Sequence, residues 1–323
     1  MAFRPWRCAQ SGPLFQPPGT PMPQRNAQRV SPTAYATGNF WVRHGMSHPA
    51  LWTPQGAWLD RGFSAFIRAT RLASGVSLEA LMVARHVGID ACLEAAIADG
   101  RVTQVIELAA GLSGRGIRFA QRHGARLTYV ETDLPDMAAL KHARLETAGL
   151  LTEQHRVVTL DALAEDGAAS LAGVAAKLDP QQGTAIITEG LVNYLPPAAA
   201  QALWRRIAGV LGDFVHGLYL SDFYLTGENR NAAMLAFGAA ISTFVGGRLH
   251  VPFDTEAQAR TAFIDDGFAT VDLHRTADLA ATRHLAHAAG ADRVRILEVW
   301  MAPRQPQRRA PPRRRKPATS PRD

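Results

Sequence analysis

One stretch constrains the fold of this chain more than any other: Gln104 to Arg118, which reads QVIELAAGLSGRGIR. A run rich in β-branched residues passes through small residues and three glycines, and residues with helical spacing follow. This order predicts a strand, a tight turn and a helix. Gly111, Gly114 and Gly116 have no side chain, so the backbone N–H groups of the turn can come close to a ligand. The turn therefore indicates a cofactor pocket.

Strands and helices are predicted to alternate along most of the chain, after a helix capped by Ser77. The predicted strands are Gln104–Leu108, Leu127–Thr132, Arg156–Leu160, Ala185–Glu189, Gly217–Phe223, Ala269–His274 and Arg293–Met301. The predicted helices between them are 115–123, 135–148, 167–178, 197–211, 254–266 and 277–289. Such alternation predicts a seven-stranded, mostly parallel α/β sheet with helices on both faces, whose ligands bind at the carboxyl ends of the strands.

The 323-residue chain is long enough for one large core. Residues 1–33, rich in Pro and Arg, and residues 304–323, a basic tail, are predicted to be disordered, so the folded domain spans 34–303. Residues 34–75 combine many aromatic residues with turn residues, which is typical of a flap, with core anchoring as the alternative. Residues 224–252 form an insertion after the fifth strand. Both segments are expected to wall a substrate cavity.

The net charge of +7 is carried by the two ends of the chain. Four arginines and no acid precede residue 34, and eight bases against one acid follow residue 303, which leaves the middle at −4. Nucleic acid is therefore expected to make only non-specific contacts with the basic tail. Cys8 and Cys92 fit neither a disulfide framework nor a closely spaced zinc site, and no apolar leader or bilayer-length run is present. A cytoplasmic location without membrane contact is predicted.

Acidic residues follow three of the predicted strands. Glu131 and Asp133 end the second strand, Asp161 follows the third, and Glu189 ends the fourth. Either acid of the second strand could accept hydrogen bonds from ribose hydroxyls, and Asp161 from an adenine amino group; the alternative is that they face solvent or cap a helix. Glu107 and Glu189 place negative charge where a sulfonium and an ammonium group fit and a pyrophosphate is repelled.

Three motifs occur in a characteristic order: Glu107-Leu-x-x-Gly111-Leu-Ser-x-Arg115, Glu131-Thr-Asp133-Leu-Pro135 with Lys141, and Thr188-Glu189-Gly-x-x-x-Tyr194-Leu-Pro196. Over roughly residues 77–215 the chain resembles the leucine carboxyl methyltransferase family and its bacterial polyketide O-methyltransferase relatives. The resemblance implies a Rossmann-like class I methyltransferase that uses S-adenosylmethionine.

The resemblance also implies a role for each motif position. Arg85 would grip the methionine carboxylate, Gly111 would approach the methionine moiety, and Asp133, with Glu131 nearby, would bind the ribose. Asp161 would bind the adenine, and Glu189 the amino-acid end of the cofactor. The alternatives are that Arg85 pairs with an acid on its own helix and that Asp161 caps the next helix.

The chain departs from the family pattern at two positions. Ala109 stands where the family usually has glycine, which can tighten the turn, and Ser113 replaces an aspartate, which removes a carboxylate from the site. A hydroxyl acceptor would need a base, whereas a carboxylate acceptor would not. Tyr194, His250 and His216 are the candidate bases. The pairs His44/His48 and His284/His287 have no third ligand nearby, so no metal site is predicted.

The sequence therefore predicts an S-adenosylmethionine-dependent O-methyltransferase that acts on a small-molecule carboxylate or hydroxyl. An NAD(P)-dependent Rossmann oxidoreductase is the alternative, although Ala109, the Glu189 motif and the lack of a Tyr-x-x-x-Lys pair oppose it. A methyltransferase or binding protein directed at RNA through the basic residues 313–316 is a second alternative. The identity of the acceptor and the oligomeric state stay open.

Overall fold

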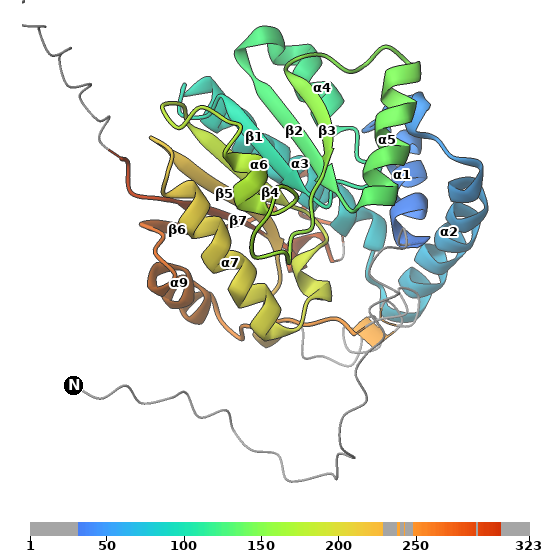
Figure 1. Cartoon of the computed structure of the whole chain (residues 1–323). Coiled ribbons are helices and arrows are strands. Elements are labelled where there is room, and N and C mark those ends of the chain that lie inside the picture. Colours follow the sequence, from blue (N-terminus) through green and yellow to red (C-terminus); the bar gives the residue numbers. More distant parts are fainter. Residues whose placement is uncertain (1–31, 229–237, 240–241, 243–247, 289, 305–323) are drawn as a thin grey trace, which may run out of the picture.

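The computed structural model describes residues 32–228, 238–239, 242, 248–288 and 290–304 (Figure 1). Its helices are α1 (Pro32–Arg43), α2 (Pro54–Ser74), α3 (Leu78–Ala98), α4 (Arg115–His123), α5 (Pro135–Thr147), α6 (Leu171–Ala175), α7 (Pro197–Leu211) and α9 (Glu256–Asp265). Its strands are β1 (Gln104–Leu108), β2 (Thr128–Asp133), β3 (His155–Thr159), β4 (Thr184–Thr188), β5 (Gly217–Phe223), β6 (Thr270–Arg275) and β7 (Arg295–Trp300). Each strand lies within two residues of its predicted position at either end.

The strands form one sheet in the order β3-β2-β1-β4-β5-β7-β6. Strands β1 to β5 are parallel to their neighbours, whereas β7 is antiparallel to both β5 and β6. The predicted seven-stranded, mostly parallel sheet is therefore confirmed. The strand order reverses between β1 and β4, and a parallel sheet opens its ligand crevice at such a reversal.

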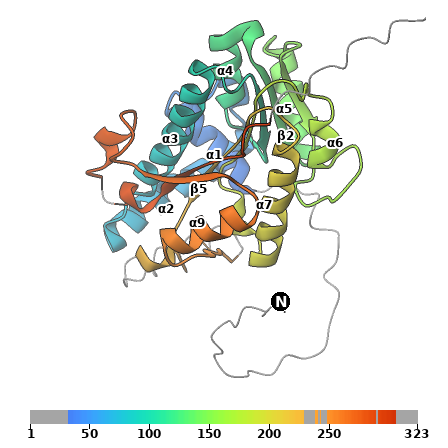
Figure 2. The same ribbon diagram turned by 90° about the vertical axis from the view of Figure 1, so that its left-hand side faces the viewer.

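Helices cover both faces of the sheet, with α3 and α4 on one side and α6 and α7 on the other (Figure 2). Strand β1 needs helices on both faces, because its successive apolar side chains point to opposite faces of the sheet. Val105 packs in a cluster with Ile89 and Leu93 of α3. Ile106 packs in a second cluster with residues of α7. All these side chains are buried, so the apolar run of β1 fills a core on each face.

The segment 34–75, predicted to be a flap, consists mainly of the helices α1 and α2. Phe40 and Trp41 of α1 are buried in a cluster with residues of α2 and α3, so the alternative of core anchoring is confirmed. Helix α1 also lies on the glycine-rich turn, since a Cβ atom on Gly38 would be 2.5 Å from the Cβ atom of Leu112. The cap segment therefore packs on the turn as part of the core.

The structure corrects the prediction of a helix at 277–289 and leaves the insertion and the two ends of the chain mostly undescribed. The predicted helix 277–289 contains only the 3-10 turn Arg283–Leu285 among its described residues. The segment is tied to the residue after β6, because the Thr282 hydroxyl donates to the carbonyl of Thr276 at 2.7 Å. Most of the insertion 224–252 and both predicted disordered ends lie outside the described residues. Within the described ranges, no helix is long and apolar enough to cross a membrane.

Candidate functional site

The carboxylate of Asp133 holds the glycine-rich turn at the carboxyl end of β1. Its Oδ2 accepts the N–H of Gly111 at 2.8 Å, and its Oδ1 accepts the N–H of Leu134 at 2.8 Å. Each oxygen keeps a further lone pair, so the group can still accept from a ligand hydroxyl. Burial raises the pKa of Asp133 and outweighs the two N–H groups that lower it. The predicted ribose-binding residue thus lies against the predicted turn.

The three glycines of the turn have different reasons to be glycine. A Cβ atom on Gly111 would meet only the Cβ atom of Ala34, at 3.7 Å, so Gly111 faces open space with a left-handed φ of 50°. A Cβ atom on Gly114 would lie 2.4 Å from the Cα atom of Ser47, and one on Gly116 would lie 2.6 Å from Cδ of Glu131. Of the three, therefore, only Gly111 has open space beside it, whereas Gly114 and Gly116 are glycine because other parts of the protein pack against them.

The two departures from the family pattern have local structural consequences. Among the described residues, Ala109 is the one non-glycine with a positive φ, 51°. An alanine in this left-handed region costs about 1–2 kcal/mol, so the turn keeps a conformation that glycine adopts more readily. The hydroxyl of Ser113 accepts the N–H of Arg115 at 3.2 Å. Ser113 therefore supports the start of α4 without a carboxylate.

Arg115 is a fully buried cation surrounded by three carboxylates. Its guanidinium contacts Asp90 at 2.5 Å, Glu107 at 2.6 Å and Glu189 at 2.5 Å. The second oxygen of Glu107 accepts the hydroxyl of Tyr129 at 2.7 Å. Glu107 was expected to contact the cofactor, but both of its oxygens are occupied by buried partners. Its charge can act on a ligand only through the arginine that it holds.

Arg85 joins the carboxyl ends of β4 and β5. Its Nε atom is 3.1 Å from Glu189 and its Nη1 atom is 3.3 Å from Asp222, so the alternative of pairing with an acid on its own helix is wrong. Asp222 also accepts the N–H of Gly190 at 2.8 Å. Sequence reasoning missed Asp222, although it ends the strand predicted at Gly217–Phe223. The search for acidic residues at the carboxyl ends of predicted strands, which gave Asp133 and Glu189, would also have given Asp222.

His86 orders Glu189 from inside α3. Its Nδ1 atom is 2.8 Å from Glu189, its Nε2 atom is 2.7 Å from Nη2 of Arg118, and its ring stacks on Trp41 with centroids 4.4 Å apart. The same Nδ1 atom also lies 2.9 Å from Nη2 of Arg115, so the imidazole sits between two guanidinium groups and the carboxylate of Glu189. Its position within a buried helix gave no functional signal in the sequence.

We call this set the Arg115 network: Arg85, His86, Asp90, Glu107, Arg115, Arg118, Glu189 and Asp222. It contains four carboxylates, three guanidinium groups and one imidazole, so the carboxylates outnumber the guanidinium groups by one. Burial opposes the charge of Glu189, but His86, Arg115 and Arg85 outweigh it and hold the pKa of Glu189 well below its usual range. The network therefore favours a cation over a pyrophosphate.

Glu131 belongs to a separate, closed group. Its oxygens contact Nζ of Lys141 at 2.6 Å and Nε2 of His155 at 2.9 Å, and all three side chains are buried. Burial opposes ionisation, but Lys141 and His155 outweigh it and lower the pKa of Glu131. The expectation of a second ribose-binding acid at the rim is therefore corrected, because Glu131 points into the protein between β2, β3 and α5.

The remaining predicted residues are spread over the molecule. Asp161 is exposed and accepts the N–H of Leu163 at 2.9 Å within a turn, whereas the next helix, α6, is capped by Ser170, so the alternative that Asp161 caps that helix is wrong. The N–H of His250 donates to the carbonyl of Asn193 at 2.7 Å, next to the partly exposed Tyr194. His216 precedes β5, and its carbonyl accepts the N–H of Thr184, the first residue of β4. His216 therefore lies at the amino ends of the strands, away from the site.

Comparison with known proteins agrees with this geometry. Residues 50–208 match the model of the leucine carboxyl methyltransferase family. This part of the chain, just under half of its length, resembles that family. The match contains Arg85, Gly111, Asp133, Asp161 and Glu189, and it ends before Asp222. The resemblance found in three motifs is thus confirmed.

Relatives of this family were found in several actinobacteria. A protein of Frankia alni named "Putative S-adenosyl-L-methionine-dependent methyltransferase" is 33% identical over 159 residues, which cover 49% of this chain and 55% of that protein. A protein of Mycolicibacterium gilvum with the same name is 39% identical over 122 residues, 38% of each chain. The chain thus spans about half or less of the length of these relatives.

Solved structures show the same fold at low identity. A "putative methyltransferase" from Thermobifida fusca superposes with a TM-score of 0.56 at 14% identity, covering 87% of this chain and 98% of that one. A DUF574 family protein from Streptomyces avermitilis has a TM-score of 0.53 at 12% identity, covering 79% and 97%. The fold is therefore the Rossmann-like class I methyltransferase fold, as predicted.

Proposed function

We propose that this protein is an S-adenosylmethionine-dependent methyltransferase that methylates an oxygen of a small molecule. The observation that carries the proposal is the position of Asp133 and Gly111 beside the carboxylate-rich Arg115 network, at the reversal of strand order between β1 and β4. S-adenosylmethionine carries a sulfonium and an ammonium group, and it supplies an electrophilic methyl group. A site with excess carboxylate charge suits such a ligand.

Each residue near the crevice is assigned to a part of the cofactor by the hydrogen-bond donors or acceptors that its protein partners leave unused. Asp133 would accept from the ribose hydroxyls, and the N–H side of the turn at Gly111 would leave room for the methionine chain. Arg85 would bind the methionine carboxylate through the edge of its guanidinium that Glu189 and Asp222 do not use. Glu189 would attract the ammonium group. Asp161 would contact the adenine with the oxygen that Leu163 leaves unused.

The acceptor is inferred from the candidate bases. Desolvation raises the pKa of Tyr194, with Arg85 opposing, so its phenol is protonated at neutral pH and does not remove a proton. His216 lies at the wrong end of the sheet, and His250 is a candidate only through its place beside Asn193. Transfer of a methyl group chiefly requires alignment and exclusion of water. A carboxylate, or a hydroxyl that ionises readily, suits this set of residues best.

The two alternatives have less support. The pyrophosphate of a nicotinamide dinucleotide would approach the carboxylates of the Arg115 network, which repel it. The RNA-directed alternative rests on residues 313–316, outside the described residues, and on no contact of the described site. Both are separated from the proposal by direct binding measurements.

The test is isothermal titration of the whole protein with S-adenosylmethionine, S-adenosylhomocysteine and NADPH. We expect one site for each of the first two ligands and no binding of NADPH. Asp213→Asn serves as a matched control, because Asp213 is exposed and precedes β5 at the opposite end of the sheet. Binding of NADPH alone would refute the proposal. Turnover with a labelled methyl donor and a panel of carboxylic acids and phenols would then identify the acceptor class.

A further inference from the structure

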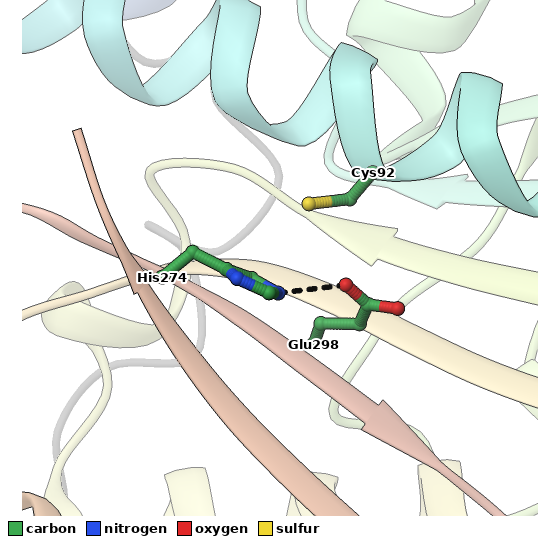
Figure 3. A group of neighbouring side chains, drawn as sticks. All are labelled: Cys92, His274 and Glu298. Carbon is green, nitrogen blue, oxygen red and sulfur yellow. Dashed lines mark hydrogen bonds and ion pairs between the residues drawn. The ribbon is translucent and has the colours of Figure 1, made fainter. Parts of the chain in front are cut away.

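Three side chains with metal-binding chemistry meet away from the cofactor site. Cys92 lies on α3, His274 on β6 and Glu298 on β7, and their ligand atoms all lie within 4.8 Å of one another. Figure 3 shows the imidazole and the carboxylate pointing toward each other, with the sulfur of Cys92 facing them from the helix. The three residues are far apart in the sequence, so they do not form a short sequence motif. Within the described part of the chain, none of the three forms a hydrogen bond or an ion pair with a side chain of the Arg115 network.

The fold brings these residues together through the register of the edge strands. In the antiparallel pair of β6 and β7, Asp272 is opposite Glu298 and His274 is opposite Ile296. Residues two apart on a strand share a face, so His274 and Glu298 are diagonal neighbours on one face. Cys92 packs in a cluster with Ile296 and Trp300, which places α3 on that same face. The helix therefore closes the space above the two polar side chains.

The carboxylate of Glu298 is held by partners on both sides. The indole N–H of Trp300 donates to Oε1 at 2.8 Å, and Nε2 of His274 lies 2.8 Å from Oε2. The guanidinium of Arg101 stacks on the Trp300 ring at 3.9 Å. Hydrogen bonds that orient a ligand from outside are typical of metal centres. Oε2 is thus left facing the imidazole and the thiol.

We propose that Cys92, His274 and Glu298 bind a divalent transition metal ion, with Zn²⁺ as the best fit. Thiolate, imidazole and carboxylate are the three ligand types that zinc uses, at distances of about 2.0–2.3 Å. Tetrahedral zinc therefore places its ligand atoms about 3.5 Å apart, which small side-chain rotations would produce here. The thiol proton and any proton on Nε2 leave to water, and no electron is transferred. One thiolate and one carboxylate neutralise the ion, which lowers the cost of burial.

The remaining ligand position and the role follow from the surroundings. Asp272, opposite Glu298 on the same face, or a water molecule would complete four-coordination. The site joins the long helix α3 to the edge strand β6 and to β7, so the bound ion would act as a cross-link that stabilises this edge of the sheet. The proposal is independent of methyl transfer, because it concerns none of the residues assigned to the cofactor.

The test uses full-length, tag-free protein stripped with a chelator and kept reduced. Titration with Co²⁺ should give one equivalent and a thiolate-to-metal charge-transfer band, and Zn²⁺ should displace the cobalt. Zn²⁺ should also raise the melting temperature, because a ligand that binds only the folded state stabilises it. Loss of a ligand in His274→Gln or Glu298→Gln should weaken Zn²⁺ binding by more than about 100-fold, since even outer partners affect affinity by 10–100-fold.

Two further variants keep the outcome decisive. His142→Gln is the matched control, because His142 is half exposed on α5, and it should bind Zn²⁺ like the wild type. Cys92→Ser should lose the charge-transfer band; if it fails to fold, the two strand variants decide the question. A titration with no sulfur-derived band, or Zn²⁺ affinity unchanged in His274→Gln and Glu298→Gln, would overturn the proposal. S-adenosylmethionine affinity, measured in parallel, should be the same with and without Zn²⁺.

Discussion

Two groups of buried charge lie on neighbouring strands of this protein and differ in one respect. Glu131, Lys141 and His155 form a closed group in which every side chain is at most 1% exposed. The Arg115 network is buried at its centre but reaches the rim, where Arg85 is 16% and Arg118 is 33% exposed. Burial and charge alone therefore do not identify a ligand site. What distinguishes a ligand site is that some of its charged groups are partly exposed and still have hydrogen-bond donors or acceptors that no protein group uses.

The largest effect is expected from removing the cation at the centre of the network. Arg115→Met would leave Asp90, Glu107 and Glu189 without their shared partner, and breaking a buried pair in this way costs about 3–5 kcal/mol. Urea denaturation followed by circular dichroism would measure the loss. Arg118→Met is the matched control, because Arg118 is partly exposed and pairs with one carboxylate, so it should cost about 1 kcal/mol. Equal stability of Arg115→Met and the wild type would disprove the network.

The closed group should affect stability without affecting the ligand. Lys141→Met removes the ion pair of Glu131 and should cost about 3 kcal/mol at neutral pH. The pKa of Glu131 is lowered in the folded state, so the stability that this group contributes is present above the ordinary glutamate pKa and is lost as the pH falls through the folded value. The difference in unfolding free energy between wild type and variant should therefore shrink below about pH 4.5.

The same variant separates the two groups by function. In folded Lys141→Met protein, calorimetry should give an S-adenosylmethionine dissociation constant within about twofold of the wild type, a difference of about 0.4 kcal/mol. Lys141 pairs with Glu131, and its charge lowers the pKa of Asp133 less than the N–H groups of Gly111 and Leu134 do, so its loss should change the crevice little. A tenfold loss of affinity would show that the closed group belongs to the site after all.

The sequence predicts much of the difference between the ligand site and the closed Glu131 group, but not all of it. The strand β1, the glycine turn and Asp133 follow from hydrophobic periodicity and turn chemistry, which are local properties. The difference between Glu131 and Asp133 does not follow from strand alternation, because residues two apart on a strand share a face. It depends on Lys141 and His155, which come from two other elements and pair with Glu131. Asp222 could have been found, since it ends a predicted strand.

Other features depend on contacts between distant parts of the chain. His86 is one of many buried residues of α3, and nothing near it in the sequence shows that Glu189 and Arg118 meet its ring. Gly116 is glycine because Glu131 lies beside it, not because a ligand does. The segment 277–289 has helical spacing, but among its described residues only the 3-10 turn Arg283–Leu285 forms, and the side chains of Asp278 and Thr282 bond to the backbone of Arg275 and Thr276. Such outcomes require the tertiary structure.

Asp133 should behave in the opposite way to Lys141, with a large effect on affinity and a small one on stability. Burial raises its pKa, so the ionised carboxylate destabilises the unliganded fold as the pH rises above its folded value. Asp133→Asn removes this charge and one hydrogen bond, so its stability at neutral pH should stay within about 1 kcal/mol of the wild type. Hydrogen bonds to a charged group contribute about 1.5–3 kcal/mol, so affinity for S-adenosylmethionine should fall about 10–100-fold. Unchanged affinity would remove Asp133 from the site.

The smallest effect is expected at Ala109, between the buried network and the open turn. Its φ of 51° costs about 1–2 kcal/mol, which glycine would relieve. Glycine also increases the entropy of the unfolded chain by about 0.4–1 kcal/mol, so Ala109→Gly should stabilise the protein by about 1 kcal/mol or less. Ala109→Val, whose branched side chain fits the left-handed region poorly, should destabilise it more than any gain from glycine. The urea midpoint at a constant slope measures both changes in stability.

Cofactor affinity should stay unchanged in Ala109→Gly, because Asp133 already fixes the N–H of Gly111. A clear loss of affinity would mean that the strained alanine, and not the carboxylate, holds the turn in its binding conformation.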